Sequence, residues 1–80
     1  MPSKPTPVPR SAGMSDQELT EAAINAVAST PAEFARITGA GVGSLSRRRT
    51  GESQLTEEHR RWYRVLIDHP HVARWLAETD

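Results

Sequence analysis

Three consecutive arginines, Arg47, Arg48 and Arg49, stand directly behind the glycine-rich segment at residues 39–43. A guanidinium group is a planar fork of N–H donors, which binds phosphate oxygens and the O6/N7 edge of guanine. The same run is also typical of a solvated helix end, where cations interact favourably with the helix dipole. The flanking sequence has to decide between these two interpretations.

The chain has 80 residues and no net charge, because ten basic residues balance ten acidic ones. Neutrality argues mildly against nucleic-acid binding, since such domains are commonly basic. The charges are unevenly distributed, however. Residues 36–64 carry seven arginines against three glutamates, a balance of +4, whereas residues 14–35 carry −4 and residues 65–80 carry −2. Positive charge is therefore concentrated around the arginine run.

Other chemistry receives little support from the residue types. The chain has no cysteine, which excludes disulfides and the usual structural zinc sites. His59, His69 and His71 lack a recognised ligand spacing, and no Ser/His/Asp, Cys/His or paired-carboxylate arrangement stands out. We expect no metal, no cofactor and no enzymatic activity.

Length and hydropathy predict one small domain in the cytoplasm. Eighty residues suffice for one domain. No apolar run approaches membrane-spanning length, and the start lacks the apolar region of a signal peptide. Residues 1–13 hold four of the six prolines without apolar periodicity, so we expect a disordered Pro-rich arm there and a domain at residues 14–80.

Capping signals predict two helices in the first half of this domain. Ser15 and Glu18 form a capping box that opens a helix through about residue 28. Thr30 then caps a short helix that has Pro31 at its first position and ends at Gly39.

Three further helices are predicted in the second half. One covers about residues 42–50, with Gly51 as its stop. Thr56 caps the next, which runs through about residue 68, and the last begins at Pro70. Strand-like alternation is absent, so the predicted fold class is all-α with five helices.

Apolar residues at helical spacing indicate which faces of the last two helices are inward. The fourth predicted helix has a stripe of Trp62, Val65 and Leu66, widened by Tyr63 and Ile67. The fifth presents Val72, Trp75 and Leu76 at positions i, i+3 and i+4.

The second and third predicted helices, with the glycine turn between them, form a helix-turn-helix pattern. Ala35 has to be small where the two helices cross. Gly39 supplies the left-handed conformation that the turn requires, and Leu45 anchors the third helix on the core. All three residue types occur at the expected offsets.

The segment at residues 38–51, TGAGVGSLSRRRTG, resembles the XRE, lambda-repressor-like family, in particular the DNA-binding half of MqsA-type and HigA-type antitoxins. A second matching motif is Arg64-Val65-Leu66 followed by His69-Pro70. The resemblance covers roughly residues 30–77. It implies a five-helix, sequence-specific DNA-binding domain that acts as a dimer.

The resemblance also implies roles for residues at the start of the third helix. Arg47 matches the family arginine that reaches base edges, and its fork suits guanine. Ser44 lies beside it, able to contact phosphate or base. Gly43 stands where the family usually has Asn, Ser or Gln, which removes a side chain that contacts a base.

Three more arginines are expected on the DNA side. Arg48 falls where the family prefers Trp or Tyr, so packing there has to use its aliphatic stem or change. Arg49 falls where the family often has Glu, and we expect it to contact phosphate. Arg36, on the second helix, is a further candidate for a phosphate contact.

A dimer surface is expected on the last two helices. Ile67 occupies a position that is polar in the antitoxin relatives, and with Val72, Trp75 and Leu76 it is able to form such a surface. Core packing is the competing interpretation for the same residues.

These observations predict a dimeric transcriptional regulator that represses its own operon by binding an inverted repeat in double-stranded DNA. One alternative is an antitoxin that neutralises a toxin protein, with the Pro-rich arm as the clamp. Another is a phage-encoded repressor of the kind associated with anti-CRISPR genes.

Overall fold

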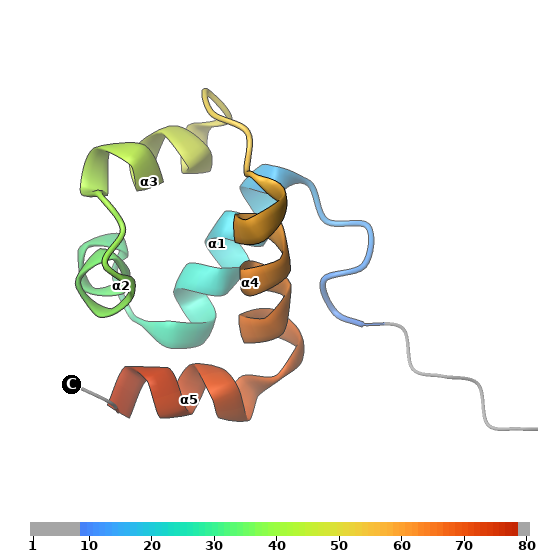
Figure 1. Ribbon diagram of the computed structural model, residues 1–80, viewed down its shortest axis with the longest axis vertical. Helices are drawn as coiled ribbons and strands as arrows, with labels where there is room; N and C mark the ends of the chain where they lie inside the picture. Colours follow the sequence, from blue (N-terminus) through green and yellow to red (C-terminus); the bar gives the residue numbers. More distant parts are fainter. Residues whose placement is uncertain (1–8, 79–80) are drawn as a thin grey trace, which may run out of the picture.

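The computed structural model describes residues 9–78, and within this range the chain forms five helices and no strand (Figure 1). They are α1 (Asp16–Val27), α2 (Pro31–Thr38), α3 (Val42–Thr50), α4 (Glu57–Asp68) and α5 (Pro70–Glu78). The all-α, five-helix prediction is confirmed. The predicted disorder of residues 1–8 lies outside the described residues.

Side-chain caps fix where three of the helices begin. Ser15 Oγ accepts a hydrogen bond from the Glu18 amide at 3.2 Å, while Glu18 Oε1 accepts one from the Ser15 amide at 3.0 Å. This is the predicted capping box, and it satisfies two amides that the helix leaves unpaired. The Thr30 hydroxyl accepts a hydrogen bond from the Glu33 amide, and the Thr56 hydroxyl accepts one from the His59 amide.

Two glycines end α2 and α3. Gly39 and Gly51 have φ of 78° and 86°, a left-handed conformation that costs residues with a Cβ atom about 1–2 kcal/mol. Gly51 is additionally constrained by space, since a Cβ atom there would lie 3.0 Å from the side chain of Gln17.

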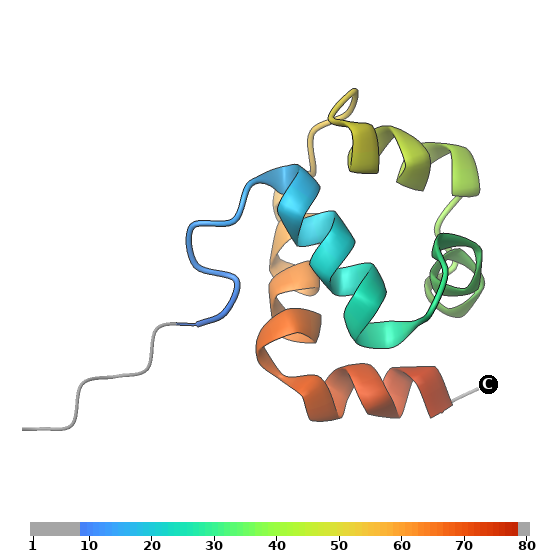
Figure 2. The same ribbon diagram turned by 180° about the vertical axis from the view of Figure 1, so that it is seen from behind.

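Helix α1 lies at the centre of the fold and packs against each of the other four helices. Leu19 and Ala23 are completely buried on its inner face. In both views α3 and α5 lie at opposite ends of the molecule, with α1 and α4 between them (Figures 1 and 2). The α3 helix is therefore held at one end of a small core built around α1.

The inward face of α4 is rotated relative to the predicted stripe. Tyr63 is 2% exposed and its ring meets that of Phe34 edge-on, with 5.9 Å between ring centroids. Because successive residues of a helix are about 100° apart, turning Tyr63 inward moves Trp62 outward. Trp62 is 39% exposed, and its predicted place in the core was wrong.

The N-terminal segment is attached to the domain from residue 9 onward. Residues 9–13 form a turn, in which the Ala12 amide donates to the Pro9 carbonyl at 3.0 Å. Ser11 is 2% exposed and donates to Asp68 twice, from its hydroxyl at 2.6 Å and from its amide at 2.9 Å. The predicted disorder was therefore wrong for residues 9–13, because these bonds tie them to the end of α4.

Replacing Ser11 by alanine should lower the free energy of unfolding by about 1–3 kcal/mol, because the hydroxyl bond to the Asp68 carboxylate is lost. Urea denaturation followed by circular dichroism measures this change. The control is Ser29→Ala, at an exposed position, which should change stability by less than about 0.5 kcal/mol. Equal effects of the two variants would show that the docked turn adds nothing to stability.

Two glycine substitutions near α3 should act in opposite directions. Gly39→Ala should cost about 1–2 kcal/mol because of its positive φ. Gly43→Ala should add about 0.5–1 kcal/mol, since Gly43 lies within the helix and alanine is the better helix former there. Thermal and urea unfolding of both variants test the prediction, and a destabilised Gly43→Ala would contradict it.

Candidate nucleic-acid interface

The outward side of α3 is set by Leu45, which is completely buried beneath it. At about 100° per residue, positions two before and two after Leu45 point away from the core. Gly43 and Arg47 occupy these positions and are exposed, as is the neighbouring Ser44. We call Gly43, Ser44 and Arg47 the outer face of α3.

The guanidinium end of Arg47 lies over Gly43. A Cβ atom built at Gly43 would be 3.6 Å from Arg47 Nη2, an ordinary van der Waals contact. Within residues 9–78 the Arg47 side chain has no hydrogen-bond or ion-pair partner, whereas its carbonyl accepts bonds from the Thr50 hydroxyl and the Ser53 amide. The main chain of Arg47 is therefore fixed and its fork is available to a partner.

The other two arginines of the run turn away from this face. Arg48 is half-buried, and its Nη1 donates to Tyr63 Oη at 3.2 Å on the α4 side. Arg49 forms an ion pair with Glu21 on the α1 side. The structure thus separates the three arginines of the run, and among them only Arg47 lies on the outer face without a partner within residues 9–78.

The predicted phosphate contact of Arg49 is not supported by this arrangement. The Arg49 and Glu21 side chains are 39% and 45% exposed, so the pair lies at the surface, and the charge that Arg49 adds to α3 is offset by the carboxylate. Arg36 is exposed at the last turn of α2.

Two of the three arginines of α4, Arg60 and Arg61, form ion pairs with carboxylates. Arg60 pairs with Asp16 at 3.2 Å and with Glu57 at 3.3 Å, and Arg61 pairs with Glu57 at 3.2 Å. Arg60 and Arg61 therefore both pair with Glu57 on their own helix, and Arg60 also pairs with Asp16 of α1.

Polar residues of α1 hold the C-terminal end of α3 and the loop that follows it. Gln17 Nε2 donates to the Arg49 carbonyl at 3.3 Å. Asp16 Oδ2 accepts from the Leu55 amide at 3.0 Å, and Arg60 Nη2 donates to both Asp16 Oδ2 and the Leu55 carbonyl at 3.3 Å. These contacts with α1 therefore fix the position of α3, and with it the position of the outer face.

The hydrogen bonds from Arg60 and from the Leu55 amide hold the pKa of Asp16 below its usual 3.8, against a smaller opposing effect of burial. Burial would raise the pKa of Asp68, but the two hydrogen bonds from Ser11 and the nearby His69 and Arg64 charges lower it overall. Both carboxylates are therefore more acidic in the folded chain than in the unfolded one.

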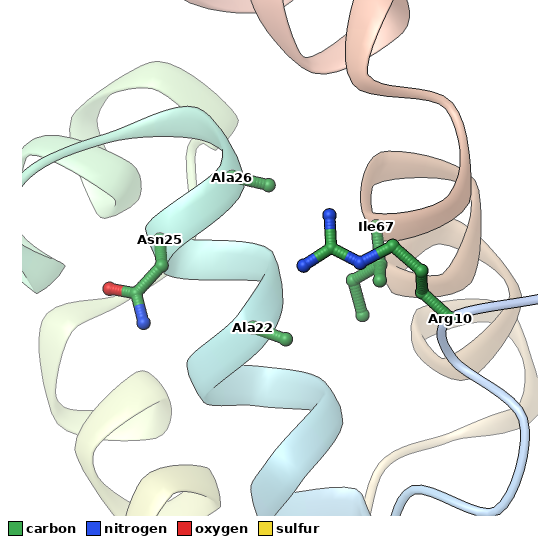
Figure 3. Close-up of a pocket in the computed structure, with 5 residues that line it drawn as sticks. All are labelled: Arg10, Ala22, Asn25, Ala26 and Ile67. Carbon is green, nitrogen blue, oxygen red and sulfur yellow. The ribbon is translucent and has the colours of Figure 1, made fainter.

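The predicted dimer surface is only partly at the surface. Ile67 is 3% exposed and faces a hollow of about 280 Å³ between α1 and the N-terminal segment, over which the Arg10 guanidinium extends (Figure 3). Core packing thus accounts for Ile67. Val72 and Leu76 are half-buried against the core, and Trp75 is 62% exposed.

The histidines do not gather with other ligand types. The rings of His69 and His71 meet edge-on, with 5.8 Å between centroids. Over residues 9–78 no three side chains of the metal-ligating types are grouped for an ion. None of the five described helices has the length and apolar character needed to cross a membrane.

Comparison of the chain with models of protein families, with curated proteins and with solved structures found no match. The resemblance of residues 38–51 to the XRE family therefore stays a prediction.

Stability should fall in acid through Asp16 and Asp68. Each has a lower pKa folded than unfolded, so its contribution is complete above the unfolded value near 4 and is lost as pH falls through the folded value. Asp16→Asn should be less stable at neutral pH and lose less stability between about pH 5 and pH 2. Urea titrations across this range measure both effects.

The control for this prediction is Glu52→Gln. Glu52 is exposed, and its side chain has no hydrogen-bond or ion-pair partner within residues 9–78, so this variant should follow the wild-type profile. Parallel profiles for Asp16→Asn and the wild type would rule out the Asp16–Arg60–Leu55 contacts as a source of acid sensitivity.

Proposed function

We propose that this chain is a sequence-specific DNA-binding transcriptional regulator that inserts α3 into the major groove. The observation that carries the proposal is the position of Arg47. It is exposed on the outer face of α3, lies over the open backbone of Gly43, and has no partner within residues 9–78. An arginine fork of this kind binds the O6 and N7 atoms of guanine.

The surroundings of Arg47 support the proposal in two ways. Gly43 has no side chain of its own, so once the flexible Arg47 side chain engages a base, the helix backbone at this turn is able to approach a base pair or phosphate closely. Ser44, one residue further, adds an exposed hydroxyl that is able to donate to a phosphate or a base.

In this function the chain acts in the cytoplasm as a homodimer on an inverted repeat, with two α3 helices about 34 Å apart in successive major grooves. The exposed Trp75 of α5, with Val72 and Leu76 beside it, is the candidate dimer contact. Repression of the chain's own operon is the expected outcome.

Arg47→Ala should weaken binding to a duplex selected by the wild-type chain from a random-sequence pool by about 1–3 kcal/mol, roughly 5- to 150-fold. Arg47→Lys should lose nearly as much, because it keeps the charge but not the fork. Fluorescence anisotropy measures the affinities, and circular dichroism checks the fold.

The control is Arg74→Ala, which removes the same charge from an exposed position on α5, at the other end of the molecule from α3 (Figure 1). It should leave duplex affinity within about twofold in a low-salt buffer. Wild-type affinity in Arg47→Ala, or equal losses in Arg47→Ala and Arg74→Ala, would refute base contact by Arg47.

A further inference from the structure

A second hollow, of about 240 Å³, lies between the α2–α3 turn and the N-terminal half of α4. The DNA-binding proposal does not use it. The side chains that matter for its chemistry are Thr38, Arg48, Glu58, His59, Trp62 and Tyr63. We call it the α4 hollow.

An exposed aromatic side chain lines the α4 hollow. Trp62 is 39% exposed although it belongs to a helix that packs on the core. Glu58 lies one turn earlier on the same face of α4, because residues four apart on a helix are neighbours. The indole and the carboxylate therefore border the same space.

The cationic side of the hollow is held in place by the core. Arg48 Nη1 donates to Tyr63 Oη at 3.2 Å, and Tyr63 is itself 2% exposed. An arginine has five N–H donors in a planar fork, so this one bond fixes the side chain and leaves donors for a ligand.

The remaining polar groups of the hollow differ in which hydrogen bonds they are still able to form with a ligand. Glu58 has no hydrogen-bond or ion-pair partner within residues 9–78, and an ionised carboxylate is an acceptor only. The Thr38 hydroxyl donates to the Phe34 carbonyl at 2.8 Å, and His59 Nδ1 is bonded to the Thr56 hydroxyl at 3.0 Å. The hollow thus offers a donor fork, a free acceptor and an aromatic plane.

We propose that the α4 hollow binds a guanine base. Guanine carries acceptors, O6 and N7, on one edge and N–H donors, N1 and N2, on the next, so it matches Arg48 and Glu58 together. Its plane stacks on Trp62. Adenine and cytosine fit less well, because each carries a ring-nitrogen acceptor on the edge where guanine offers the N1 donor.

Titration with guanosine monophosphate tests the proposal, with adenosine and cytidine monophosphates at the same charge as controls. The Trp75→Phe variant leaves Trp62 as the only tryptophan, so its fluorescence reports on the hollow. We expect saturable quenching by the guanine nucleotide at an affinity about tenfold or more above the others. Equal affinities for all three would overturn the proposal, because only the shared phosphate would then bind.

Two variants of the hollow should weaken guanine binding in calorimetric titrations. Glu58→Gln should abolish the preference over adenine, and Trp62→Ala should lower affinity by about tenfold or more. Glu57→Gln is the control, since Glu57 pairs with Arg60 and Arg61 outside the hollow. Unchanged guanine preference in Glu58→Gln, with the fold intact by circular dichroism, would also overturn the proposal.

A short oligodeoxyadenosine containing one guanine distinguishes the source of the base. Tighter binding of this oligonucleotide than of the free nucleotide assigns the site to a single strand, and the reverse order assigns it to a nucleotide. No binding of either probe refutes the site. Arg47→Ala should lose duplex affinity and keep guanine binding. A failure of the guanine proposal is therefore distinguishable from a failure of the DNA-binding proposal.

Discussion

The position of α3 depends on hydrogen bonds from the first half of α1. Asp16 holds the loop after α3, Gln17 holds the Arg49 carbonyl in the last turn of α3, and Glu21 pairs with the Arg49 side chain. The same helix also forms the centre of the core, where Leu19 and Ala23 are completely buried. A single helix therefore fixes both the packing of the domain and the orientation of its most exposed helix. A change in the tilt of α1 would be transmitted directly to the outer face of α3.

These contacts also explain how a chain with no net charge presents a cationic group. Carboxylates of α1 and α4 pair with Arg49, Arg60 and Arg61. The pairs are at or near the surface, where such interactions contribute little to stability. Their larger effect is on the distribution of charge. The carboxylates offset the positive charges of Arg49, Arg60 and Arg61, whereas the positive charge of Arg47 is not offset by an ion pair within residues 9–78. Net charge is consequently a poor guide to the local charge on the surface of this molecule.

Much of the fold was predictable because helix boundaries depend on neighbouring residues. The Ser15 capping box and the left-handed Gly39 each need only a few residues of sequence. The errors concern contacts between distant segments. Trp62 faces outward because Tyr63 meets Phe34, and residues 9–13 are ordered by Asp68. No local pattern encodes such pairings. The same distinction applies to the candidate site. The exposure of Arg47 was predictable from helical geometry, whereas the partners of Arg48 and Arg49 come from distant segments and were not.

The glycine at position 43 affects how the surface of α3 is able to evolve. Functional surfaces commonly gain new specificity at the expense of stability. Here the glycine lies within a helix, with ordinary contact distance around it, so almost any small side chain fits and favours the helical state. A new side chain at this position also lies beside the Arg47 fork. If α3 binds DNA as proposed, one mutational step at position 43 is sufficient to alter the binding preference and to strengthen the fold together.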